Sequence, residues 1–176
     1  MVLFGGFKND GERCNESYIF HFGDHRWERI NSPSKELPAP RAGHSAVVNG
    51  DDMYIFGGKD SEIRMDDLWK FNLKTYEWTR ITAPDQPSTR CGHNAQLWGQ
   101  YMIVYGGFFA LCQELNDMHV FDLKNERWVC LFEELNSTMK ETGLNLTGQN
   151  TLQKSPTKIG GPDRRGTMID HNGSLK

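Results

Sequence analysis

Histidine and cysteine are the side chains of this sequence best suited to proton transfer or metal binding, but their spacing forms no recognised site. His21 and His25 are four residues apart, yet the pattern places one on a strand and the other in the following turn, so helical ligand geometry does not apply. No H-E-x-x-H, phosphate-binding loop, G-x-S-x-G or G-x-G-x-x-G motif is present. None of the four cysteines belongs to a C-x-x-C pair: Cys14, Cys91, Cys112 and Cys130. The sequence therefore predicts a protein that is not an enzyme and has no cofactor or metal.

An arginine and a histidine recur together at a fixed distance. Arg41-Ala42-Gly43-His44 matches Arg90-Cys91-Gly92-His93 with a shift of 49 residues, and Arg164-Arg165-Gly166 begins a partial third copy. Histidine titrates near neutral pH, so a catalytic role stays open as the alternative. A catalytic residue needs to occur only once, however, whereas these recur. We therefore interpret these arginines and histidines as members of a structural bond network.

The elements around these residues also repeat. Three glycine pairs each follow a short apolar run and are each followed about twenty residues later by a tryptophan; the tryptophans are Trp27, Trp78 and Trp128. They lie 51 and 50 residues apart (78 − 27 and 128 − 78), a period that indicates a repeat architecture. We assign a structural role to all the recurring residues: Gly5, Gly6, Trp27, Arg41, Gly43, His44, Gly57, Gly58, Trp78, Arg90, Gly92, His93, Gly106, Gly107, Trp128, Arg164 and Gly166.

Arg-x-Gly-His, an apolar strand, Gly-Gly, an aromatic residue and then Trp is the pattern of the kelch repeat. The chain resembles a kelch β-propeller over residues 1–132, and again at 164–175. The resemblance implies an all-β fold, a partial propeller of about three four-stranded antiparallel blades. In such a stack the tryptophans fill the space between sheets, and the glycine pairs end strands near a crowded axis.

The predicted strands divide the chain into three parts. We expect strands at 1–4, 17–22, 27–30, 43–49, 53–56, 67–73, 78–82, 92–98, 101–105, 117–123 and 128–132. Residues 1–132 thus hold blades 1–3, the first without its first strand; residues 133–163 form a long polar insert loop; and residues 164–176 supply the first strand of a further or ring-closing repeat. Propellers typically have 4–8 blades. We therefore expect the rest of a longer chain, or self-association, to close the ring.

Composition excludes several classes of protein. The chain has 176 residues and a net charge of −3, which argues against a nucleic-acid binder. It has neither an apolar run long enough for a membrane span nor a visible signal peptide. We therefore expect a cytoplasmic, or else nuclear, protein with reduced thiols and without membrane partners. The four Asn-x-Ser/Thr sequons, at Asn15, Asn136, Asn145 and Asn172, are then expected to be unused.

Function in a framework of this kind is expected in its loops. The turns between second and third strands, at 7–14, 59–65 and 108–115, vary most: two are charged and the third is apolar. We predict a partner-binding face built from Lys8, Arg13, Lys59, Arg64, Phe108, Phe109 and Leu111. Alternatively, Phe108 and Leu111 pack onto their own blade. The sequence therefore predicts a protein-interaction scaffold, a substrate-recognition module or an adaptor.

The resemblance also raises a metal-dependent alternative. Some kelch-like propellers are copper or iron enzymes, and a copper radical site would require a Tyr–Cys cross-link among clustered His and Tyr ligands. Cys14 and Cys112 instead fall in predicted turns without such a cluster. This makes an enzyme the less favoured of the two interpretations.

Overall fold

The computed structural model describes residues 1–110 and 113–131. The chain divides into two compact units, Met1–Thr138 and Met139–Lys176, and every described strand belongs to the first. The predicted insert loop at 133–163 and the strand predicted within 164–176 lie outside the described residues, as do Leu111, Arg164 and Gly166.

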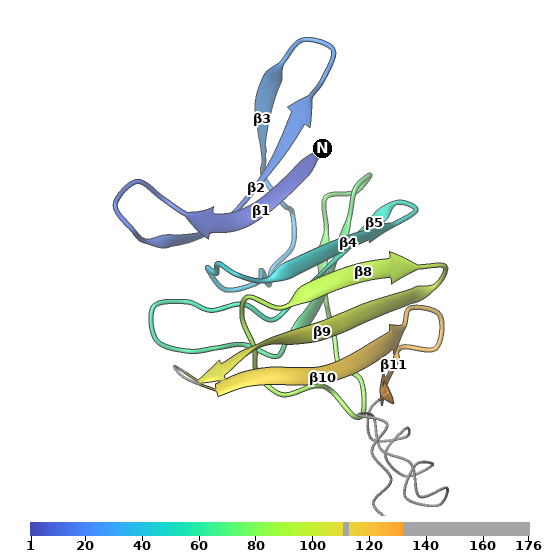
Figure 1. Ribbon diagram of the computed structural model, residues 1–176. Coiled ribbons are helices and arrows are strands. Elements are labelled where there is room, and N and C mark those ends of the chain that lie inside the picture. The colour runs from blue at the N-terminus through green and yellow to red at the C-terminus, as the bar shows by residue number, and fades with distance from the viewer. Residues whose placement is uncertain (111–112, 132–176) are drawn as a thin grey trace, which may run out of the picture. The chain divides into compact units, whose positions relative to one another are not determined.

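Three separate antiparallel sheets make up the described part of the chain (Figure 1). The first contains β1 (Val2–Phe7), β2 (Arg13–His21) and β3 (Arg26–Ile30). The second contains β4 (Ser45–Asn49), β5 (Asp52–Phe56), β6 (Leu68–Asn72) and β7 (Trp78–Ile81). The third contains β8 (Asn94–Trp98), β9 (Tyr101–Ala110), β10 (Gln113–Asp122) and β11 (Arg127–Cys130). The predicted all-β class with about three blade-like sheets is confirmed, and none of the sheets is closed on itself.

The order of strands within each sheet follows the chain. In the second and third sheets each strand pairs with the next one in sequence, from β4 to β7 and from β8 to β11. Short hairpins suffice for such antiparallel neighbours. The first sheet begins at the equivalent of β5, so its three strands match the last three of the other sheets.

Alternation along the strands gives the middle sheet two apolar faces. Met53, Ile55 and Trp69 belong to the core shared with the first sheet, whereas Tyr54 and Phe56 belong to the core shared with the third. Successive strand residues point to opposite sides, so a continuous apolar run such as 53–56 is what a sheet covered on both faces requires. The tryptophans Trp78 and Trp128 are buried in these two cores.

Trp27 departs from the prediction that all three tryptophans fill the space between sheets. Its side chain is 48% exposed, against 6% for Trp78 and 1% for Trp128. The physical reason is that Trp27 points away from the middle sheet, and no other sheet of the described residues covers that side.

The glycine pairs also differ from expectation in one respect. Only β5 ends before its pair, whereas β1 and β9 run through Gly5-Gly6 and Gly106-Gly107. The β1–β2 pairing shifts register between Phe4 and Gly6, so the pair forms an irregularity in the ladder and does not end the strand. The backbone φ of Gly57 is +63°, which favours glycine.

Candidate interaction face

The recurring arginines are buried anchors at the start of the second and third sheets. Arg41 is fully buried and donates to both carboxylate oxygens of Asp67, at 2.6 and 2.9 Å, and to the carbonyl of Gly57 at 2.9 Å. Arg90 makes the same bidentate contact with Asp117, at 2.7 and 2.9 Å. Paired, hydrogen-bonded charges of this kind are tolerable in an interior. One pair holds Asp67, directly before β6, and the other holds Asp117 on β10.

The carboxylates of these pairs are held ionised. Burial alone would raise the pKa of Asp117, but hydrogen bonds with Arg90 and His119 outweigh it and lower the pKa to about 2. Burial would likewise raise the pKa of Asp67, but the hydrogen bonds and charge of Arg41 outweigh it, and the pKa is lowered. Both pairs are therefore charged at neutral pH.

The same arginines connect neighbouring sheets through their backbones. The Gly6 amide donates to the carbonyl of Arg41 at 2.8 Å, and the Gly58 amide donates to that of Arg90 at 2.8 Å. A Cβ atom on Gly57 would lie 2.7 Å from the Arg90 carbonyl oxygen. The glycine pairs are thus the points where one sheet approaches the loop that opens the next.

His44 and His93 lie in these junctions. The ring of His44 meets Phe4 edge-on at 5.5 Å between centroids, and His93 meets Phe56 with the same separation. His93 Nε2 lies 2.7 Å from the hydroxyl of Ser45, which joins the second and third sheets. Burial, and then the charge of the neighbouring arginine, lowers the pKa of each histidine to about 4. Both rings are therefore neutral at physiological pH.

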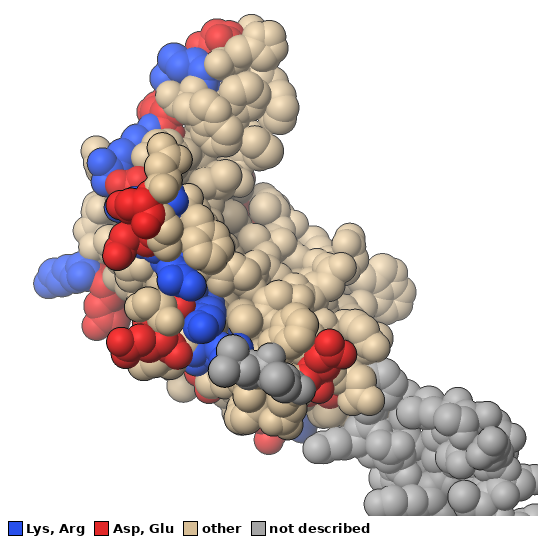
Figure 2. Space-filling model, turned by 60° about the vertical axis from the view of Figure 1, so that its left-hand side comes forward, with Lys and Arg blue, Asp and Glu red and all other residues tan. Residues whose placement is uncertain are grey.

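The guanidinium groups of Arg13 and Arg64 lie on one side of the molecule. Arg13 and Cys14 were predicted in the turn at 7–14, but both lie on β2, which begins at Arg13. Arg13 lies over the ring of Phe7, with its guanidinium carbon 4.9 Å from the ring centroid. The Nε atoms of Arg13 and Arg64 are buried, and neither has a hydrogen-bond partner among residues 1–110 and 113–131. Neither guanidinium forms an ion pair with those residues. Figure 2 shows charged side chains gathered in one band of the surface that it presents.

Asp60, in the turn of the second sheet, lies near Arg13 of the first sheet. Its carboxylate accepts the amides of Ile63 and Glu62, at 2.6 and 2.8 Å, and these bonds are the main reason why its pKa is lowered. The charges of Arg13 and Lys59 lower it further. Arg13, at the start of β2, thus lies near the turn of the second sheet.

Phe108 and Phe109 lie on a strand, so their predicted place at a loop tip is wrong. β9 continues to Ala110 because Phe108 still pairs with Glu114, and Ala110 with Gln113, in the β9–β10 ladder. The two side chains are 40% and 42% exposed. The Phe108 ring packs beside Gly92, 3.5 Å from the place of a Cβ there. Phe108 is therefore partly packed on the neighbouring loop and partly open.

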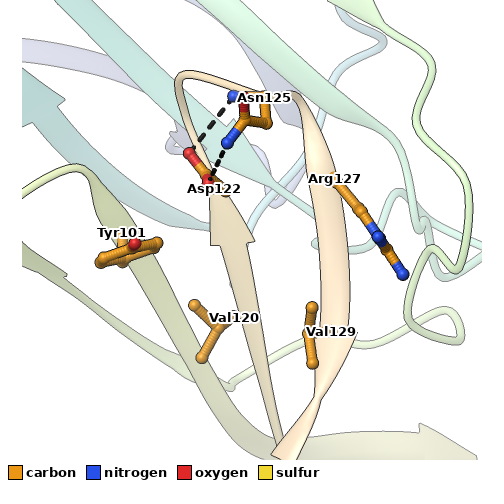
Figure 3. A pocket seen from close by; sticks show the side chains of 6 residues that line it. All are labelled: Tyr101, Val120, Asp122, Asn125, Arg127 and Val129. Atoms are coloured by element: carbon orange, nitrogen blue, oxygen red, sulfur yellow. Dashed lines mark hydrogen bonds between the residues drawn. The ribbon is translucent and has the colours of Figure 1, made fainter.

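A pocket of about 420 Å³ lies on another surface, the side of the third sheet that faces away from the middle sheet (Figure 3). Tyr101, Val120 and Val129 line it, and Asp122 and Arg127 stand at its polar end. The Asp122 carboxylate is already engaged, because it accepts the side chain of Asn125 at 2.7 Å and backbone amides of its own turn. The pocket is therefore apolar, with a polar edge committed to the turn.

Within the described residues, no group of three or more His, Cys, Asp or Glu side chains is placed to hold a metal ion. Cys14, Cys91 and Cys130 carry free thiols. The described part of the chain also contains no helix with the length and apolar character needed to cross a membrane.

Comparison with known proteins assigns the fold to a family. Residues 1–147 match the KLHDC2/KLHL20/DRC7 Kelch-repeats domain. The chain belongs to the kelch-repeat family.

The relatives that this chain matches are much longer than it is. Kelch domain-containing protein 10 of Rattus norvegicus is 32% identical over 85 residues, which are 47% of this chain and 21% of that protein. Kelch domain-containing protein 3 of Homo sapiens is 40% identical over 85 residues, 46% of this chain and 22% of that protein. The Rho GTPase-activating protein gacHH of Dictyostelium discoideum is 28% identical over 133 residues, 73% of this chain and 9% of that protein. The chain thus spans about a fifth or less of the length of the relatives that it matches.

Two features of these kelch sheets were missed by sequence reasoning. One is the pairing of Arg41 with Asp67 and of Arg90 with Asp117, for which the nearly equal spacings of 26 and 27 residues were the available signal (67 − 41 and 117 − 90). The other is the pocket beside Tyr101, whose residues carry no repeat motif.

Proposed function

We propose that this kelch chain is a protein-interaction module, serving as a scaffold, an adaptor or the substrate-recognition part of a larger protein. Its binding surface is the turn face, made of Lys8, Arg13, Lys59, Arg64, Phe108 and Phe109. The observation that carries the proposal is the combination of partly exposed Phe108 and Phe109 with the Arg13 and Arg64 guanidinium groups, which lack ion-pair partners among the described residues. Aromatic and arginine side chains are the types that dominate protein interfaces.

The charge of this surface indicates the character of the partner. Arginine presents donors that match carboxylates, and two such groups from neighbouring sheets favour a partner segment that carries acidic side chains. Phe108 and Phe109 would then contact an apolar part of the same segment. The match to 9% of a Rho GTPase-activating protein supports the idea that such a module occurs inside larger proteins. The free thiols of Cys14, Cys91 and Cys130 support our placement of it in the cytoplasm.

Affinity capture from the native source, followed by mass spectrometry, tests this function. The baits are the wild-type chain, a Phe108→Ser/Phe109→Ser variant and an Arg13→Glu/Arg64→Glu variant. Trp98→Ser is the matched control, because this aromatic residue is 71% exposed at the β8–β9 turn, away from the turn face.

We expect the two turn-face variants to lose partners that the wild type and the Trp98 control retain, with capture normalised to the folded protein. The proposal fails if all four baits capture the same proteins. It also fails for the phenylalanines if Phe109→Ser lowers stability while capture per folded molecule stays unchanged.

A further inference from the structure

The two outer sheets each expose an apolar face on the side away from the middle sheet. The head face, on the first sheet, consists of Leu3, Tyr18, Phe20 and Trp27. The tail face, on the third sheet, consists of Ile103, Tyr105, Val120 and Val129. Leu3 is 42% exposed, and Trp27 and Tyr105 are both 48% exposed. The ion pair of Arg29 with Glu16 borders the head face, and Asn94 and Gln96 of β8 border the tail face. Exposed aromatic side chains gathered on one sheet face, with polar residues at its rim, mark a contact surface.

The repeat register shows what these faces are built to contact. Phe4, Phe56 and Tyr105 each directly precede a glycine pair. Phe4 meets the tryptophan of the second sheet, Trp78, at 4.8 Å between ring centroids, and Phe56 meets that of the third, Trp128, at 5.0 Å. Each internal interface therefore joins the aromatic residue before a glycine pair to the tryptophan of the following sheet.

Two residues lack this contact among the described residues. Tyr105 precedes the third glycine pair but meets no tryptophan of a following sheet, and Trp27 is the first tryptophan but meets no aromatic residue that precedes a glycine pair. Because the middle sheet separates the sheets that carry them, these two side chains face away from each other within one chain. Their contact is available between two chains.

The residues around Trp27 match the internal interfaces as well. Strand pairing aligns Leu3, Phe20 and Trp27 with Ile55, Phe71 and Trp78, which are buried in the core between the first and second sheets. On the opposite side, Ile103 and Tyr105 align with the buried Tyr54 and Phe56. The head and tail faces thus carry the two complementary halves of an interface that the molecule already forms twice.

We propose that a second copy of this chain covers these faces, with the head face of one copy docked on the tail face of the other. Trp27 then packs on Tyr105 of the other copy, and the pocket beside Val120 and Val129 receives part of the incoming aromatic cluster. The interface is of the heterologous kind, which forms a ring when its rotation closes. Two copies of the three sheets that residues 1–110 and 113–131 form would supply six, within the 4–8 typical of closed propellers. The proposal concerns a different surface from the turn face and does not depend on it.

The head-to-tail arrangement predicts a complementation that other dimers do not. Trp27→Asp removes the head face and leaves the tail face intact, whereas Tyr105→Asp does the reverse. Each variant alone should be monomeric by sedimentation velocity, with association weakened roughly thirtyfold or more, as for an interface hot spot. An equimolar mixture of the two should regain a dimer held by one intact interface. Ile63→Asp, at a turn residue that is 62% exposed and on neither face, should remain associated like the wild type.

A crosslink keeps the test decisive if an aspartate variant fails to fold. A mixture of Trp27→Cys and Tyr105→Cys chains should form a reducible disulfide dimer at a much higher yield than either variant alone. The proposal is overturned if the wild-type chain is monomeric at all accessible concentrations. This holds also if the reason is that residues 132–176 cover Trp27. Dissociation by Trp27→Asp but not by Tyr105→Asp, or a mixture that stays monomeric, overturns the head-to-tail arrangement.

Discussion

At the residue scale, Gly57 is constrained by the close approach of the third sheet's opening loop as well as by its own backbone conformation. Gly57 and Gly50 have nearly equal φ values, +63° and +61°, so replacement by alanine carries a similar conformational cost at both positions, about 1–2 kcal/mol. A Cβ at Gly50 meets nothing within 4 Å, whereas one at Gly57 lies 2.7 Å from the Arg90 carbonyl oxygen. Gly57→Ala must therefore also displace the junction between the second and third sheets.

We expect Gly57→Ala to lower the free energy of unfolding by clearly more than Gly50→Ala, by roughly 2 kcal/mol or more in addition, as in other overpacked interiors. Urea denaturation of the two variants beside the wild type measures this difference. Equal losses at the two glycines would show that conformation alone accounts for the recurring pair.

The neutral histidines give stability a pH dependence. Burial, with the arginine beside each ring, lowers the pKa of His44 and His93 to about 4 in the folded state, whereas the unfolded chain has the ordinary value near 6.5. Below about pH 6.5 the unfolded chain therefore takes up protons that the folded chain does not. Stability from these residues is complete above that pH and is lost progressively as the pH falls toward 4.

We expect the free energy of unfolding to fall between pH 6.5 and 4 by a few kcal/mol in total. His93→Gln should reduce the slope over this range, even though the variant is less stable at pH 7 because the contact with Ser45 is altered. His25→Gln, at an exposed turn residue, is the control for replacing a histidine by glutamine. An unaltered slope in His93→Gln would contradict the depressed pKa.

Sequence alone predicted which residues recur but not the atoms that they contact. The Arg-x-Gly-His segments were assigned to a bond network, but the sequence analysis did not identify their acceptors, Asp67 and Asp117. A sequence motif shows which residues are repeated. It does not show ion pairs between residues that are 26 or 27 positions apart in the sequence, because only the fold brings those residues into contact.

At the element scale, the same tryptophan has different energetic roles in different sheets. Trp78 is 6% exposed and packs on Phe4 and Phe71, whereas Trp27 is 48% exposed. We expect Trp78→Ala to lower the free energy of unfolding by about 3–5 kcal/mol, as for a large aromatic residue in a core. Trp27→Ala should cost less than about 1 kcal/mol under dilute conditions, as for a surface site.

Thermal or urea denaturation of both variants at low concentration checks this contrast. Comparable losses at the two tryptophans would mean that the head face is already covered within a single chain. In that case the tryptophan series would behave uniformly, as the repeat pattern alone predicts.

The strands themselves were predictable because their apolar runs and turns repeat with the glycines and tryptophans. Predicted and observed strands agree closely in the second sheet, where 53–56 and 78–82 correspond to β5 and β7. The prediction failed where two strands extend beyond their glycine pairs. Since the β9–β10 ladder tolerates register shifts, the strands continue to Ala110 and place Phe108 and Phe109 on a strand.

At the scale of the whole molecule, the number of sheets followed from the period of about 50 residues, but the contacts of the outer faces did not. A repeat pattern specifies that each sheet needs neighbours and leaves open which chain supplies them. The exposure of Trp27 and Tyr105 only becomes visible once the three sheets are placed.

The stacked arrangement also predicts uneven stability along the chain. The middle sheet has apolar cores on both faces, whereas the first and third each share one core with it. In repeat architectures stability is approximately a sum of terms for each repeat and for its interfaces with neighbours. Amide hydrogen exchange should therefore be slowest in β5 and β6, and faster in β2, whose sheet has three strands and one covered face.

Association should change this gradient in a defined direction. In the wild-type chain at high concentration, docking of the head face should slow exchange in β2 and β3, while the strands of the middle sheet change little. In Trp27→Asp the same strands should keep their fast exchange at every concentration, because the docked state is lost. Uniform protection of all three sheets in that variant would show instead that the unit unfolds as a single cooperative body, with no separate contribution from each interface.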